Sequence, residues 1–210
     1  MLVTFGPAFF LPPPPPGGAA AAQVASYYLD HRSALLLAGW VGLLAFPLGF
    51  AFFTGLGLHL RGEGTLSTWL FLIALISIAV TLSVAAVQGV LALAVPYVAT
   101  SVRPEELKPI ADVSQLGFSA AFAFETAYFL ATGFLVLRSR ALPAWLGYGA
   151  VVVAPIALTA SLGVIAGSGP LAAGGPVTLL AFVAGLLWWL LAAVMLVVRK
   201  PRSVYSSPQV

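Results

Sequence analysis

The sequence predicts an all-α, polytopic transmembrane helix bundle, and three observations carry that prediction. Of the 210 residues, 61% are hydrophobic and 7% are charged, whereas soluble domains carry roughly 25% charged residues. The mean hydropathy is +1.06. Long apolar runs recur along the chain, and about 20 such residues span a hydrocarbon core of roughly 30 Å. The length fits one compact bundle rather than several domains.

Five apolar runs are long enough to be complete spans, and the connections between them are short. They cover residues 33–60, 67–98, 113–137, 144–167 and 177–198. Because short loops join antiparallel neighbours, we expect consecutive spans to pack side by side.

The N-terminal region is apolar but too short for a complete span. Met1–Leu11 has about half the required length, and the five prolines that follow cannot continue a helix. We interpret residues 1–11 as a remnant or truncated first span, with an unstructured tail as the alternative. Residues 12–32 predict an outer Pro/Ala-rich loop with a short interfacial helix, whose Tyr27 and Tyr28 lie at headgroup level. Residues 199–210 predict a polar cytoplasmic tail.

Two patterns predict where the third complete span begins. Pro104 is followed by two acidic residues, which is a helix-start pattern and predicts a short outer segment. Asp112, with Gln115 three positions later, matches a capping box. We therefore expect the spanning helix itself to begin near residue 113.

The distribution of Lys and Arg predicts the orientation. If the spans alternate, six basic residues and only Glu63 fall on one side, while three basic residues and four acidic residues fall on the other. This positive-inside bias predicts a cytoplasmic C-terminus, and the Ala- and Gly-rich composition predicts a bacterial plasma (inner) membrane. The six basic residues are Arg61, Arg138, Arg140, Arg199, Lys200 and Arg202, and the three are Arg32, Arg103 and Lys108.

Glu125 is the charged residue inside a predicted span. An ionised carboxylate near the bilayer centre costs roughly 2.5–3.5 kcal/mol, so this side chain should face the bundle interior or a wet cavity. Ser114, Tyr128 and Thr132 fall within about 60° of it on the helical wheel. Together these four residues form a polar stripe on an otherwise apolar helix.

The preceding span carries a second polar stripe, formed by Ser77, Thr81 and Gln88. Because a short loop makes the two helices neighbours, we expect the stripes to meet and Gln88 or Thr81 to donate a hydrogen bond to the Glu125 carboxyl. Two interpretations stay open. The carboxyl is either a proton or cation site, or a protonated group that joins two helices at a gain of about 0.6–2 kcal/mol.

No catalytic, cofactor or metal site can be assembled from the sequence. The chain has no cysteine, which excludes thiol catalysis and Cys-ligated metals. His31 and His59 flank one span, and their separation of about 42 Å along a helix prevents them from sharing an ion or a haem. We therefore predict a protein that is not an enzyme and holds no cofactor.

Aromatic residues are concentrated in a few segments. Residues 46–53 and 118–129 are rich in Phe, and these rings either line a greasy pocket or pack against lipid. The pair Trp188 and Trp189 lies in the middle of a span, where either ring fills the bundle, faces lipid or walls an internal cavity.

Four features together resemble a known class of proteins. They are the proline run at 12–16, Ala-x-x-Val-Ala-Ser-Tyr-Tyr-Leu-Asp-His-Arg at 21–32, Leu-Pro-Ala-Trp-Leu-Gly-Tyr at 142–148 and Gly-Pro-Leu-Ala-Ala-Gly-Gly-Pro at 169–176. The chain resembles a class of small multi-span membrane proteins of unknown function from high-GC, actinobacterial-type genomes. The resemblance implies a helical protein of the plasma membrane and carries no activity or site residue with it. The short first span departs from the pattern.

Two functions are compatible with these observations. The first is a non-enzymatic integral membrane protein with an accessory, scaffolding or lipophile-binding role. The alternative is a small proton-coupled transporter that uses Glu125, which requires a polar path from this residue to both sides. The predicted partners are the lipid bilayer and either another membrane protein or a second copy of the chain. Nucleic acid is excluded because the net charge of +3 is too small and too local.

Overall fold

The computed structural model describes residues 12, 14–15, 18–167 and 169–198, and these residues form a bundle of helices. Five of the helices are long and apolar enough to cross a membrane, and the described residues contain no strand. The predicted all-α polytopic bundle is therefore confirmed. The predictions for residues 1–11 and 199–210 lie outside the described residues.

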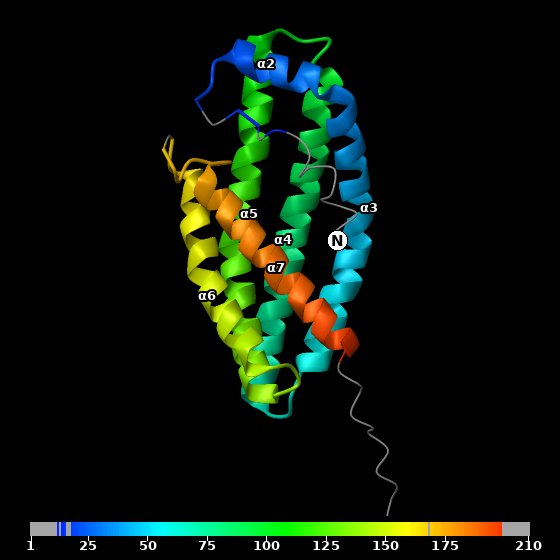
Figure 1. Cartoon of the computed structure of the whole chain (residues 1–210), viewed down its shortest axis with the longest axis vertical. Helices are drawn as coiled ribbons and strands as arrows, with labels where there is room; N and C mark the ends of the chain where they lie inside the picture. The colour runs from blue at the N-terminus through cyan, green and yellow to red at the C-terminus, as the bar shows by residue number, and fades with distance from the viewer. Residues whose placement is uncertain (1–11, 13, 16–17, 168, 199–210) are drawn as a thin grey trace, which may run out of the picture.

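Four long helices run between two ends of the bundle, and a fifth crosses them (Figure 1). Figure 1 shows α3, α4, α5 and α6 running lengthwise, α2 lying across one end, and α7 passing obliquely in front of α4 and α5. We call the two ends the α2 end and the Arg138 end. The helices are α2 (Ala21–Asp30), α3 (Arg32–Leu60), α4 (Thr65–Val98), α5 (Pro104–Ser139), α6 (Ala144–Ser161) and α7 (Pro176–Val198), with a 3-10 turn, η1, at Leu162–Val164.

Helix α5 begins at Pro104 rather than near residue 113, so the expected break before the third span is wrong. Its N-terminus is capped at Arg103, whose backbone N–H donates to Glu106 Oε2 at 3.3 Å. Asp112 pairs instead with Lys108 one turn earlier, at 2.6 Å. Because the first-turn proline and the Glu106 cap already start the helix, it continues unbroken through Asp112.

Helix α6 ends earlier than the span predicted for residues 144–167. The α-helix stops at Ser161, and the chain continues as the 3-10 turn η1. A Cβ on Gly163 would lie 3.0 Å from the carbonyl oxygen of Leu171, so the chain folds back on itself here. Only glycine fits at position 163 because the backbone at Leu171 lies so close. The 3-10 turn and this reversal of the chain replace the last turn of the predicted span.

Helix α2 is docked on the bundle and does not lie free at a membrane surface. Tyr28 is 8% exposed, so its ring packs into the bundle, and the headgroup level of the two tyrosines stays a prediction. Burial, helped by Tyr27 and Asp112, raises the pKa of Tyr28 to about 12. The cluster that holds α2 against α4 and α5 contains Val24, Ala25, Tyr28, Val95, Ala99, Leu107 and Ala111.

Helices α5 and α6 meet along a seam of small residues. A Cβ on Gly133 would lie 2.9 Å from both the carbonyl oxygen of Gly147 and Cγ2 of Val151, so only glycine allows the two backbones to approach this closely. Trp188 Nε1 then donates to the carbonyl oxygen of Leu146 at 2.8 Å, which fastens α7 to α6. We call α5, α6 and the contacts between them the packed seam.

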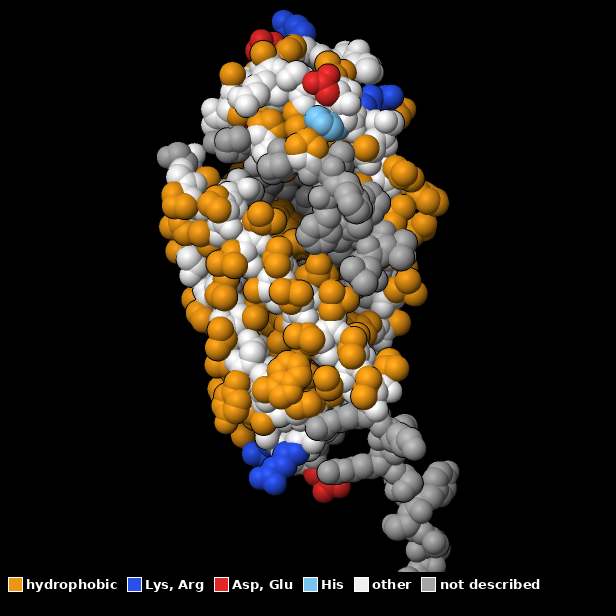
Figure 2. Space-filling view, viewed as in Figure 1, with side chains coloured by type: hydrophobic (Ala, Val, Ile, Leu, Met, Phe, Trp, Pro, Cys, Tyr) orange, Lys and Arg blue, Asp and Glu red, His pale blue; other side chains and the backbone are white. Residues whose placement is uncertain are grey.

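Charged side chains gather at the two ends, and hydrophobic side chains cover the flank between them (Figure 2). At one end Arg138 Nε donates to Ser67 Oγ at 3.1 Å, which ties α5 to α4. An apolar belt between two polar ends is the surface that a bilayer requires. The chain is therefore a membrane protein.

Candidate functional site

A cavity of about 330 Å³ lies between α3, α4, α5 and α7. Its lining on α3 runs from Leu35 to Phe53, about 27 Å along the helix. The polar side chains among its lining residues are Thr81, Gln88 and Glu125, and the remainder of its wall is apolar. The cavity is elongated, and its volume falls within the range of roughly 300–1,000 Å³ that small-molecule sites occupy.

Glu125 lies in the wall of this cavity at its deep end, far from α2. The side chain is 8% exposed, and within the described part of the chain its carboxyl makes no hydrogen bond or ion pair. The carboxyl faces α7, because a Cβ on Gly185 would lie 3.9 Å from Glu125 Oε2. A largely buried carboxyl with no donor from these residues needs an explanation, because buried polar groups are usually hydrogen-bonded.

The two predicted stripes meet, but not at Glu125. Gln88 Nε2 donates to Ser114 Oγ at 3.3 Å. Ser114 lies three turns before Glu125, roughly 16 Å along α5, so the antiparallel register brings Gln88 to the wrong level. The Thr81 hydroxyl is buried without a hydrogen-bond partner among the described residues. The predicted hydrogen bond from Gln88 or Thr81 to Glu125 is therefore wrong.

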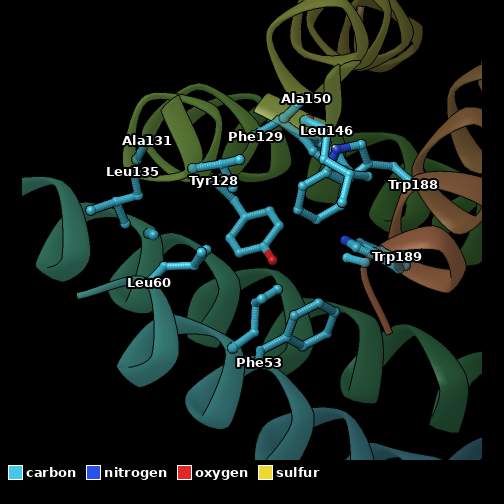
Figure 3. Close-up of a cluster of buried hydrophobic side chains, with 14 of the residues drawn as sticks. Phe53, Leu60, Tyr128, Phe129, Ala131, Leu135, Leu146, Ala150, Trp188 and Trp189 are labelled. Carbon is cyan, nitrogen blue, oxygen red and sulfur yellow. Dashed lines mark hydrogen bonds between the residues drawn. The ribbon is translucent and has the colours of Figure 1, made fainter. Parts of the chain in front are cut away.

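The remaining residues of the stripes are not among the lining residues of the cavity. Tyr128 and Thr132 line a separate void of about 10 Å³, which is about the size of one water molecule. Figure 3 shows Tyr128 among packed rings, and its ring centroid lies 5.5 Å from that of Phe53. Ser77 is buried but lines neither space. Of the seven predicted site residues, Thr81, Gln88 and Glu125 share the cavity.

Two aromatic pairs share the cavity wall with Glu125. Phe118 and Phe182 have ring centroids 5.7 Å apart, and Phe53 and Trp189 have centroids 5.2 Å apart. All four rings line the cavity. Phe182 was not among the predicted aromatic residues. Phe182 lies two turns before Trp189, so the two rings share a face of α7, and this spacing was the signal that could have predicted it. Because α7 is apolar on every face, no periodic pattern marks that face as the one that lines a cavity.

Both interpretations of the aromatic segments are correct in part. Trp189 walls the cavity, while its neighbour Trp188 is buried against α6. Phe46, Phe53 and Phe118 line the cavity. Phe122 and Phe129 are buried in the protein core, whereas Phe50 and Phe124 are exposed on the bundle surface.

The two histidines lie at opposite ends of α3. His31 Nδ1 lies 2.9 Å from the carbonyl oxygen of Tyr27 at the junction of α2 and α3, and His59 is exposed near the Arg138 end. Over the described ranges, no group of three or more His, Asp and Glu side chains could hold a metal ion.

Comparisons with protein-family models, with curated proteins and with solved structures give no match for this chain. The cavity and the charged ends therefore carry the functional inference.

Proposed function

We propose that the chain is a non-enzymatic membrane protein that binds a small lipophilic molecule in the cavity between α3, α4, α5 and α7. The observation that carries the proposal is the cavity itself, which is about 330 Å³ in volume and has a largely apolar wall. Close-packed protein interiors contain few voids larger than a water molecule. A space of this size inside a bundle of apolar helices suits a hydrocarbon ligand taken from the bilayer.

The chemistry of the cavity wall favours binding over catalysis. Glu125 is the ionisable side chain among the lining residues. Acid–base and nucleophilic catalysis need at least one further positioned group, such as a second carboxyl or a histidine. His31 and His59 do not line the cavity.

Two glycines on α3 provide a matched test of this function. Gly42 lines the cavity, and Gly55 does not, but a Cβ on either one meets no atom within 4 Å. In lipid nanodiscs, a photoreactive long-chain alcohol should label the cavity wall of the wild-type protein. Gly42→Phe should lower this labelling about tenfold because the ring fills the cavity, while Gly55→Phe should leave it unchanged. Equal labelling of the two variants, mapped by mass spectrometry, contradicts the proposed function.

We further propose a bacterial plasma membrane location with the Arg138 end in the cytoplasm, as the positive-inside rule suggests. The described part of that end carries Arg61, Arg138, Arg140 and Glu63. The chain contains no cysteine, so a single introduced cysteine reports on which side of the membrane its position lies. In intact cells a membrane-impermeant maleimide should label Ser101→Cys at the α2 end and spare Thr65→Cys. The reverse labelling pattern would show that the orientation is opposite to the proposed one.

A proton-coupled transporter is the alternative, and the position of Glu125 in a cavity favours it. Transport needs a path from the carboxyl to both ends. Beyond Glu125, on the side of the Arg138 end, the way is filled by the packed rings of Phe53, Tyr128 and Phe129. This alternative therefore requires the cluster to open. Proton flux into proteoliposomes that is abolished by Glu125→Gln would support it, and no flux in either protein would reject it.

A further inference from the structure

We infer that the ligand is a single-chain lipophilic amine whose ammonium group binds Glu125 and whose hydrocarbon chain lies along α3. This inference rests on the proposed function and specifies the chemical class of the ligand. It follows from the surroundings of one carboxyl, from the rings beside it and from the shape of the cavity.

The Glu125 carboxyl needs a donor that the described residues do not supply. It is buried in the cavity wall, and no hydrogen bond or ion pair reaches it from them. The polar lining residues of α4 do not serve, since the Gln88 amide donates to Ser114 and the Thr81 hydroxyl makes no hydrogen bond to a described residue. A buried carboxylate is stable when a cation pairs with it, and charge-assisted hydrogen bonds are about twice as strong as neutral ones. An ammonium group meets both requirements.

The rings beside Glu125 favour the same charge. Two aromatic pairs line the same cavity as the carboxyl, and Gly185 on α7 leaves the carboxyl room to face that helix. The paired rings are Phe118 with Phe182, and Phe53 with Trp189. Aromatic faces attract ammonium groups, by about 2 kcal/mol where the cation is desolvated. Among the described lining residues there is no Lys, Arg or His, so a fatty acid or a lipid phosphate would face Glu125 without a compensating charge from them. The site therefore selects against anionic lipids.

The shape of the cavity suits one hydrocarbon chain. The cavity follows α3 for about 27 Å, yet its volume is only about 330 Å³, so it is long and narrow. A Cβ on Gly42, one of the lining residues of α3, would meet no atom within 4 Å, so the space is open at this point. One extended alkyl chain fits along this length.

The first residues of the chain are the competing occupant. Tyr27 Oη donates to the carbonyl oxygen of Pro12 at 2.9 Å, and Gln115 Nε2 donates to that of Pro15 at 3.3 Å. Pro12 and Pro15 therefore lie at the α2 end, and eleven further residues of any chain reach at most about 36 Å. The segment at residues 1–11 is apolar, so the test must separate it from a free amine.

Three photoreactive probes with the same chain length and different head groups test the inference. The full-length protein in nanodiscs is labelled with the amine, the alcohol and the carboxylic acid, and the labelled residues are mapped by mass spectrometry. The amine should label the cavity at least about tenfold more than the acid. Glu125→Gln should remove the preference for the amine, while the alcohol should still label the cavity of this variant, which shows that the variant is folded. Glu125→Asp should keep part of the preference.

The other outcomes separate the two proposals. Suppose that the amine and the alcohol label the cavity equally, that Glu125→Gln has no effect, and that Gly42→Phe blocks both probes. The inference that the ligand is an amine is then overturned, and the proposed function stands. If no probe labels the cavity, both proposals are overturned. If labelling occurs only after residues 2–11 are removed, the N-terminal segment is the occupant and the inference of a free amine is overturned.

Discussion

The packed seam and the α3 side of the bundle are built from similar residues and differ in how closely they pack. In an 18-residue apolar window of α5, 56% of the residues are buried, against 6% for α3. Glycine is present on both sides. At the seam, Gly133 and Gly147 face each other and bring two backbones into contact, whereas Gly42 on α3 faces open space in the cavity. Pairing of small residues on both helices therefore makes a tight interface, and glycine content alone does not.

Helix α7 joins the two regions and belongs to both. Trp188 fastens it to the packed seam, and the next residue, Trp189, forms part of the cavity wall. This arrangement places a rigid frame on one side of α7 and an adaptable space on the other. Ligand sites are commonly built in this way, with a loosely packed region held by a stable scaffold.

The largest effect should come from breaking the packed seam. Gly133→Val places side-chain atoms within the space held by the Gly147 carbonyl and Val151, and overpacking of this kind costs about 1–3 kcal/mol. Gly55→Val, on the open face of α3, is the matched control and should change stability by less than about 0.5 kcal/mol. Thermal unfolding followed by tryptophan fluorescence measures both. Equal unfolding midpoints would show that the seam is not tightly packed.

The adjacent tryptophans sharpen the comparison at a single point of α7. Trp188→Phe removes the buried hydrogen bond to Leu146, whereas Trp189 Nε1 has no hydrogen-bond partner among the described residues. Both rings are well buried, so the loss of apolar area is similar in the two variants. Trp188→Phe should therefore be less stable than Trp189→Phe by about 1–2 kcal/mol. The opposite ranking in a denaturant titration would place the hydrogen bond elsewhere.

The variant Glu125→Leu tests whether the carboxyl contributes to stability by joining two helices. Since no hydrogen bond joins it to the described residues, its replacement by an apolar side chain of similar volume should leave stability unchanged or raise it by about 1 kcal/mol. The interpretation of Glu125 as a group that joins two helices requires a loss of about 0.6–2 kcal/mol instead. The free energy of unfolding in mixed micelles distinguishes the two.

The smallest effect is expected where the two polar stripes meet. Gln88 and Ser114 share one hydrogen bond at 3.3 Å, and such interhelical bonds contribute on average about 0.6 kcal/mol. A double-mutant cycle with Gln88→Leu and Ser114→Ala should return a coupling of that size. A coupling of zero would mean that this contact does not link α4 and α5.

The sequence alone determined the class of the protein and the approximate position of each described span. Apolar composition and run length decide these, because the hydrocarbon core demands about 20 apolar residues and internally satisfied backbone groups. It also singled out Glu125, because a charge is conspicuous in such a run. The start of α5 was missed since a capping pattern at Asp112 competes with an equally good one at Pro104, and only the folded chain shows which is used.

Only the tertiary structure decided what surrounds Glu125. In water-soluble helices a polar face reveals which side is buried, but in apolar helices such as α3 and α7 lipid and protein interior are equally apolar, so the pattern carries no such signal. Helix crossing and register decide three features of the site. They are the rings of Phe182 and Trp189 in the cavity wall, the open space at Gly42, and the level of Gln88 relative to α5. Crossing and register are set by the fit of side chains between helices far apart in the chain, and a linear pattern does not encode that fit.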